Sequence, residues 1–426
     1  MVLNYIWIGF FLAAMLVAFI RTLGYFMQQG FDITLWRVFT EADRDVFREI
    51  VQSTFNMAET SVKISIYLIG IMTLWLGIMK IGEKGGAVNI LSRGVSPFFR
   101  RIFPEIPKNH PAMGSILMNF CANMLGLDNA ATPLGLKAMK ELQEINPKKN
   151  TASNAQIMFL VLNTSALTII PISIIALRAA AGAANPADVF LPLLLTTFFS
   201  TLAGLIAVSI VQRINLFNWV VLAYLGGVSL FIAGLFVFLK TLSQSHLEVF
   251  SVLSGNIILF GFIIFFMIIG LRSKINIYET FIEGAREGFE VAIKIIPYLV
   301  AMLVAIGVFR ASGAFDFLLN GIATLLGWIG FDTSFVPALP TAFMKPLSGS
   351  GARGMMVETM THYGPDSFVG RLSSIFQGST ETTFYTVAVY YGAVNIRKTR
   401  YTISCGLIAD LAGMLAAIFW GYIFFR

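Results

Sequence analysis

Two groups of polar residues interrupt a chain that is otherwise strongly apolar, and their residue types could bind a solute. The first group consists of one segment in each half of the chain. Its residues are Asn119, Asn123, Asp128, Asn129 and Thr132 in the first half and Ser348, Ser350 and Arg353 in the second. Backbone N–H groups around Ser350 could favour an anion if a half-helix begins there. We expect a binding site, with a tight turn packed against a neighbouring helix as the alternative.

The second group lies inside long apolar runs and again has one segment in each half. Its members are Asn163, Thr164, Ser165 and Thr168 in the first half and Gln377, Ser379, Thr380, Glu381, Thr382 and Thr383 in the second. Hydroxyl side chains in membrane helices often bond their own backbone or join helices, but that does not explain an ionisable residue. We expect Glu381 to contact the substrate or a coupling ion, with a structural hydrogen bond as the alternative. Asp410 is a second coupling candidate, and helix packing is its alternative role.

The chain lacks the patterns of common enzymes. Its histidines, His110, His246 and His362, lie far apart with no Glu or Cys at metal-ligand spacing. No phosphate-binding loop of the form GxxxxGK[ST] occurs, and Gly349-Ser350-Gly351 lacks the full G-x-S-x-G nucleophile pattern. We therefore expect no enzyme, no metal and no cofactor, and we expect gradient-driven rather than ATP-driven movement.

Composition places these residues in a membrane protein. Hydrophobic residues make up 57% of the 426 positions and charged residues 12%, against roughly a quarter charged in soluble domains. Runs of the length needed to cross a bilayer predict nine crossings: Tyr5 to Ile20, Ile64 to Met79, Ile157 to Leu177, Val189 to Val211, Trp219 to Leu239, Phe250 to Leu271, Ile295 to Phe309, Phe368 to Tyr391 and Tyr401 to Phe425. Ala87 to Ile102 and Ala314 to Phe343 are apolar but interrupted, which predicts re-entrant or hairpin segments.

The two halves of the chain repeat the same order of features. Glu59, Lys63 and Tyr67 recur as Glu290, Lys294 and Tyr298 on one helix face. Leu202-Ala203-Gly204 similarly recurs as Leu411-Ala412-Gly413. We expect Lys63 and Lys294 to be interfacial residues paired with the glutamates four positions before them.

Charge indicates that the two halves are inserted in opposite directions. Basic residues precede the polar-broken helix in the first half, at Lys148 and Lys149, and follow it in the second, at Arg397 and Lys398. Basic loops stay in the cytoplasm, so the excess of 30 basic over 23 acidic residues reflects topology rather than a nucleic-acid partner. Four residues disagree with this scheme and leave the first helix without a firm orientation: Arg21, Arg37, Arg44 and Arg48.

Sequence motifs in both halves of the chain carry a family resemblance. Residues 1 to about 215, with the motif Asn123 to Gly135 and Asn163-Thr164-Ser165, resemble bacterial spore maturation protein A. Residues from about 275 to 426, with the motifs Lys345 to Gly354 and Gln377 to Thr383, resemble spore maturation protein B, and residues 216–274 would connect the two parts. The resemblance extends to nucleoside-recognition, or gate, domains, which implies transport but not a nucleoside as substrate.

Together these observations predict an all-α polytopic membrane protein of two inverted-topology repeats with broken or re-entrant helices. The expected function is secondary transport or exchange of a small polar or anionic solute across the bacterial inner membrane, with proton or cation coupling. The alternative is a non-transporting gate-fold assembly or sensor. We also expect a homodimer, since Gly226 and Gly227 could allow close packing of lipid-facing helices.

Overall fold

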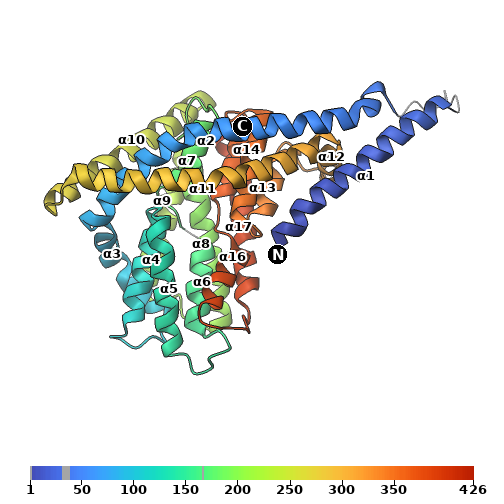
Figure 1. Cartoon of the computed structure of the whole chain (residues 1–426). Helices are drawn as coiled ribbons and strands as arrows, with labels where there is room; N and C mark the ends of the chain where they lie inside the picture. The colour runs from blue at the N-terminus through green and yellow to red at the C-terminus, as the bar shows by residue number, and fades with distance from the viewer. Residues whose placement is uncertain (1, 31–38, 166) are drawn as a thin grey trace.

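The computed structural model describes residues 2–30, 39–165 and 167–426, and helices make up most of this part (Figure 1). The side chains of residues 128–130 and the whole of Arg37 lie outside the described part. The first-half helices are α1 Val2–Gly30, α2 Glu41–Gly85, α3 Ala87–Ile102, α4 Pro111–Met124, α5 Asp128–Glu144, α6 Asn154–Ser165, α7 Ile172–Ala180 and α8 Phe190–Gln212. The remaining helices are α9 Trp219–Thr241, α10 Gln244–Arg272, α11 Ile277–Ala311, α12 Ala314–Trp328, the 3-10 turn η1 Val336–Ala338, α13 Leu339–Met344, α14 Gly349–Tyr363, α15 Phe368–Gly378, α16 Thr383–Gly392 and α17 Thr402–Phe425.

Seven helices in the described part are long and apolar enough to cross a membrane, namely α1, α2, α8, α9, α10, α11 and α17. Each coincides with one of the apolar runs of the sequence. Side chains on α1, α9 and α10 are largely exposed in the chain by itself, as lipid-facing helices would be. The chain is therefore an all-α polytopic membrane protein.

The other two predicted crossings, Ile157 to Leu177 and Phe368 to Tyr391, are broken helices, as the polar motifs within them predicted. The first is divided between α6 and α7, and the second between α15 and α16. Hydroxyl side chains bond carbonyl groups near the end of each half-helix, since Thr164 Oγ1 donates to Val161 O at 3.0 Å and Ser379 Oγ donates to Phe376 O at 2.9 Å. Both polar motifs thus mark the ends of half-helices.

The interruption predicted within Ala87 to Ile102 is absent, because this segment forms one uninterrupted helix, α3. Pro97 lies within it and removes one backbone donor. The buried side chains of Phe99 and Ile102 anchor the helix beyond this point. Ala314 to Phe343 is interrupted as expected, into α12, η1 and α13.

The long helices α2 and α11 lie side by side and antiparallel across the rest of the bundle (Figure 1). Lys84 and Lys80 near the end of α2 pair with Glu283 and Glu287 near the start of α11. The helices approach closely at Gly288, where an added Cβ would lie 2.4 Å from the carbonyl oxygen of Met72. A residue with any side chain would force the two backbones apart.

Helices α8 and α17 form a second antiparallel pair, with reciprocal contacts between repeated residues. Ser200 Oγ donates to Ala409 O at 3.0 Å. A Cβ at Gly204 would meet Ala409, and a Cβ at Gly413 would meet Ser200. The repeated glycines thus occupy corresponding places on the two sides of one interface.

Loops from the two halves meet at both ends of the bundle. At one end, Ala152 N donates to Lys398 O at 3.0 Å, so the two basic loops of the sequence lie together. At the other end, the guanidinium of Arg178 is fully buried and pairs with Asp188 at 2.9 Å and with Asp366 at 3.3 Å. Asp188 also pairs with Arg371 at 2.7 Å.

Candidate functional site

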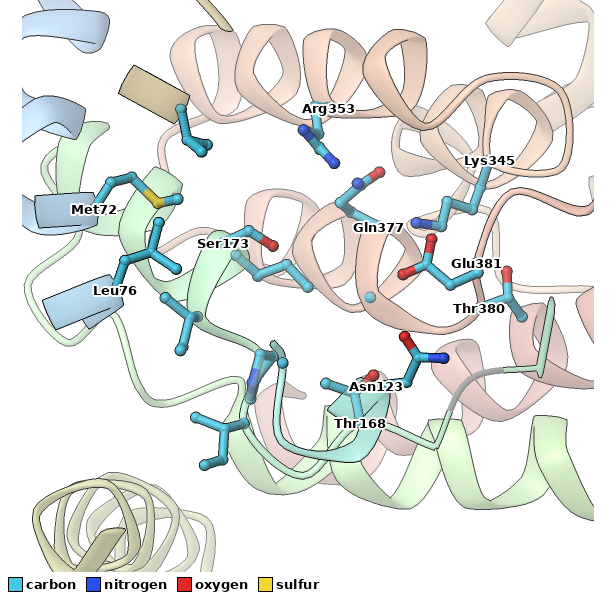
Figure 2. A pocket seen from close by; sticks show the side chains of 17 residues that line it. Met72, Leu76, Asn123, Thr168, Ser173, Lys345, Arg353, Gln377, Thr380 and Glu381 are labelled. Carbon is cyan, nitrogen blue, oxygen red and sulfur yellow. The ribbon is translucent and has the colours of Figure 1, made fainter. Parts of the chain in front are cut away.

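A cavity lies between the two halves at the place where both polar-broken helices are interrupted (Figure 2). Its walls come from α2, from the tip of the α4–α5 hairpin and from the breaks after α6 and α15, with further residues from α7, α11 and α14. The lining residues are Met72, Leu76, Asn123, Gly126, Thr168, Ile170, Pro171, Ile172, Ser173, Ile174, Val291, Lys345, Arg353, Gln377, Gly378, Thr380 and Glu381.

Ionisable side chains gather on one side of this cavity. Lys345 and Glu381 point toward one another, and the guanidinium of Arg353 points toward Gln377 (Figure 2). Lys345 is 5% exposed and Gln377 4%, so both are buried well below the surface. Nε of Arg353 and Oε1 of Gln377 are buried without a hydrogen-bond partner in the described part of the chain. Such atoms remain available to a bound solute or water.

The opposite side of the cavity is apolar. Met72 and Leu76 of α2 lie across from Lys345 and Glu381 (Figure 2), and Val291 of α11 joins them in the lining. The antiparallel helix pair therefore closes this side. The cavity volume is about 90 Å³, below the roughly 300–1,000 Å³ of pockets for drug-sized ligands. In this conformation it accommodates water or a small solute group.

Backbone hydrogen bonds hold the two breaks against each other and against the hairpins of their own halves. Glu381 N donates to Thr164 O at 2.7 Å, which joins the second break directly to the end of α6. Ile169 N donates to Met124 O at 2.7 Å, and Phe384 N donates to Pro346 O at 3.1 Å. These contacts fix the lining side chains on otherwise irregular backbone, which membrane proteins tolerate where it lines a cavity.

Six of the residues singled out in the sequence line the cavity, namely Asn123, Thr168, Arg353, Gln377, Thr380 and Glu381. Two further polar residues, Lys345 and Ser173, were missed. Lys345 stands at the start of the motif that carried the family resemblance, so its place between Met344 and Pro346 was the only available signal. Ser173 follows Pro171 closely, and nothing in its spacing distinguished it from a packing residue.

The other candidates mainly satisfy the backbone around the cavity. Asn119 Nδ2 donates to Ala131 O at 2.7 Å, and Asn163 Oδ1 accepts from Asn123 Nδ2 at 2.8 Å. Ser165 is fully buried and donates to Leu162 O. The side chains of Asp128 and Asn129 lie outside the described part.

Helix α14 begins at Gly349, at the place where the sequence predicted the N-terminus of a half-helix. Ser348 Oγ accepts a hydrogen bond from Gly351 N at 3.0 Å and also contacts Ser350 Oγ at 3.2 Å. Ser348 is therefore the N-cap of α14. Neither Ser348 nor Ser350 lines the cavity.

Asp410 lies behind the cavity lining. Its side chain is 1% exposed, and Oδ2 accepts a hydrogen bond from Thr383 Oγ1 at 2.7 Å at the start of α16. Its second oxygen, Oδ1, has no partner in the described part. Asp410 does not touch the cavity, but it is connected to the second break. No group of three or more His, Cys, Asp or Glu residues that could hold a metal occurs among the described residues.

Comparisons with known proteins agree with the resemblance seen in the sequence. The model of the gate family, described as nucleoside recognition, matches residues 65–181 and 292–397, just over half of the chain. Spore maturation protein B of Bacillus subtilis (strain 168) is 48% identical over 152 residues, which are 36% of this chain and 84% of that protein. Spore maturation protein A of the same organism is 42% identical over 159 residues, 37% of this chain and 81% of that protein. No solved structure matches the chain.

Proposed function

Because the chain belongs to the nucleoside-recognition gate family, we propose that it is a secondary transporter or exchanger in the bacterial inner membrane. The observation that carries the proposal is the cavity between the two halves. It lies where both polar-broken helices are interrupted, and both halves contribute to its wall. Secondary transporters commonly bind their solutes between broken helices at the interface of two repeats.

We further propose that the halves are inverted-topology repeats. Equivalent helices α2 and α11 pack antiparallel, as do α8 and α17. The contact between Gly204 and Ala409 corresponds to the contact between Ser200 and Gly413 when the halves are exchanged. An approximate two-fold axis perpendicular to the helices produces such reciprocal contacts.

The proposed solute is small and polar or anionic. Arg353 and Lys345 supply positive charge at the polar side of the cavity, and Arg353 Nε and Gln377 Oε1 supply a donor and an acceptor that have no hydrogen-bond partner among the described residues. Met72 and Leu76 would face the less polar part of the solute. Because the cavity volume is about 90 Å³, entry of a larger solute requires α2 and α11 to move away from the breaks.

Glu381 is the proposed coupling residue. It is the carboxylate in the cavity lining, and its backbone is joined to the first half through Thr164 O. Exchange of a proton or binding of a cation at Glu381 would change the charge of the cavity and could thereby favour one arrangement of the two halves. Asp410 is the second candidate for this role.

Solute profiling of a strain that lacks the gene, followed by uptake assays in vesicles, tests the transport proposal. We expect one class of small ionic solute to change in the deletion strain and the purified protein to move it down a gradient. A reconstituted, folded protein that moves none of the affected solutes would favour the non-transporting assembly or sensor instead.

Cysteine labelling tests the proposed topology. The native Cys121 and Cys405 are both buried, so background labelling should be low. Single cysteines at Lys148 and Arg397 should both react only from the cytoplasmic side. Reaction of either from the opposite side would contradict the proposed insertion.

A homodimer is the proposed assembly. No atom lies within 4 Å of a Cβ placed at Gly226 or Gly227, so this face of α9 is open to a second copy. Native mass spectrometry should show a dimer in mild detergent, and Gly227→Leu should reduce it. A monomer as the sole species would contradict the proposal.

A further inference from the structure

A second, larger cavity lies between α3, α8 and α9, away from the polar site. Its volume is about 370 Å³, and its walls are almost entirely apolar, with Phe98, Leu195, Leu202, Leu225, Val228 and Phe231 among them. The two hydroxyl groups in the lining are already used. Thr201 Oγ1 donates to Ser165 O, and Tyr224 OH donates to Gly94 O at 2.5 Å. The cavity therefore offers hydrocarbon contacts and no free hydroxyl donor.

A basic pocket adjoins the apolar cavity along the same two helices. Arg100 and Arg101 in the last turn of α3, and Lys108 in the loop that follows, line it together with Val220 of α9. Val220 lies one helical turn before Tyr224, which lines the apolar cavity. The three basic side chains belong to exposed residues and form no ion pair within the described part of the chain. Their charge is available to an external anion.

Aromatic residues at the start of α9 indicate where this basic pocket lies relative to the lipid bilayer. Trp219 is 87% exposed, close to the exposed Phe217, and exposed tryptophan side chains favour the boundary between lipid headgroups and hydrocarbon. The basic pocket beside Val220 then lies at headgroup level. The apolar cavity, which follows α9 from Tyr224 to Leu235, extends toward the hydrocarbon.

The pocket also lies at the end of the bundle that carries the basic loops. Helix α8 ends at this level, where Gln212 Nε2 donates to Asn154 O at 2.8 Å. Asn154 directly follows the loop that contacts Lys398. This is the proposed cytoplasmic side, whose leaflet is rich in anionic lipids.

We propose that this composite site binds an anionic phospholipid. Its phosphate headgroup contacts Arg100, Arg101 and Lys108, and one acyl chain occupies the apolar cavity between α3, α8 and α9. Charge complementarity at the mouth and the absence of free hydroxyl groups within the cavity distinguish this occupant from a polar metabolite or a protein segment. Gly226 and Gly227 line neither cavity.

Native mass spectrometry of the full chain in mild detergent tests the headgroup contact. Phosphatidylglycerol and phosphatidylcholine with identical acyl chains are added in equal amounts. The wild type should retain several times more phosphatidylglycerol, and the Arg100→Gln/Arg101→Gln variant should lose this preference. The matched control Lys140→Gln/Lys148→Gln removes two exposed basic residues that line neither cavity and should keep it. Equal retention of the two lipids by the wild type, or an equal loss in the control variant, would overturn the headgroup assignment.

Filling the cavity tests the acyl-chain contact. Leu225→Trp and, separately, Val228→Phe should lower retention of both lipids, because each larger side chain occupies space in the cavity. Only a variant that elutes as a single folded species in size-exclusion chromatography is compared with the wild type. Unchanged retention by a folded cavity-filling variant would overturn the proposed place of the acyl chain.

Discussion

The two halves of the molecule contribute similar backbones but different chemistry at their breaks. The second half supplies every ionisable residue of the polar cavity, Lys345, Arg353 and Glu381, whereas the first half supplies neutral side chains such as Asn123 and Thr168. Counted from the aligned motifs Asn163-Thr164-Ser165 and Gln377-Gly378-Ser379, the position of Glu381 corresponds to Leu167. Glu381 lines the polar cavity, while Leu167 lines the apolar cavity beside α9.

This difference shows how a repeat can keep one architecture and divide its tasks. Both breaks are held by a backbone hydrogen bond to the hairpin of their own half, so the architecture does not depend on the charge of the side chains. Because only the second half contributes ionisable side chains to the polar cavity, the interface between the halves has one ionic site there. Substitutions at corresponding places in the two halves should therefore have unequal effects.

The largest expected difference in unfolding free energy is between substitutions at the two ends of the bundle where the halves meet. Arg178 is fully buried and pairs with Asp188 and Asp366, so Arg178→Ala leaves buried charge incompletely paired and should cost about 3–5 kcal/mol of unfolding free energy. The exposed Arg400 makes one hydrogen bond, to Ala152 O at 3.0 Å, and Arg400→Ala should cost roughly 0.5–1.5 kcal/mol. Equilibrium urea unfolding in micelles measures both. Equal costs would contradict the contrast between the two ends.

A smaller difference in unfolding free energy is expected between two glycine substitutions on the long helices α2 and α11. Gly288→Ala places a Cβ 2.4 Å from Met72 O and should destabilise the protein by about 1–3 kcal/mol, as overpacking does. Gly70 on α2 has nothing within 4 Å of its added Cβ, so Gly70→Ala should be neutral or stabilising because alanine favours the helix. The same unfolding assay applies. A harmless Gly288→Ala would show that α2 and α11 separate easily.

The smallest effects are expected at the repeated surface pairs. Lys63 lies 2.6 Å from Glu59, and Lys294 lies 3.9 Å from Glu290, with all four side chains mostly exposed. Lys63→Gln and Lys294→Gln should leave stability and flux close to wild type, because exposed pairs of this kind contribute little. A loss of flux in either variant, with normal membrane insertion, would assign these lysines a functional role.

The sequence predicted that the protein spans a membrane, and it predicted the seven helices of the described part that are long and apolar enough to do so. It also predicted six residues that line the polar cavity. Hydrophobic runs show where a span can lie, but they do not show whether it is continuous. Gln377 to Thr383 and Asn163 to Ser165 predicted broken helices, but the sequence did not predict which residues end the half-helices, namely Ser165 and Gly378. Pro97 suggested an interruption that packing of Phe99 and Ile102 prevents.

Contacts between distant segments were beyond the reach of sequence patterns. The buried ion pairs of Arg178 could not be predicted, because its partners Asp188 and Asp366 are brought to it by the fold. Lys345 likewise joins Glu381 in the cavity through the α13–α14 hairpin. Ser348 was recognised as polar, but its role as the cap of α14 requires the backbone geometry.

The most direct test of the proposed transport site is to measure how solute flux by the Glu381→Gln variant depends on an ion gradient. The solute identified by the deletion strain is loaded into vesicles that contain wild-type or variant protein, and flux is measured with and without a proton or sodium gradient. Glutamine keeps the size and hydrogen bonding of Glu381 but removes its charge change, so the folded variant should lose the dependence of flux on the gradient. Ion-dependent flux equal to that of the wild type would contradict the coupling role of Glu381 and move that role to Asp410.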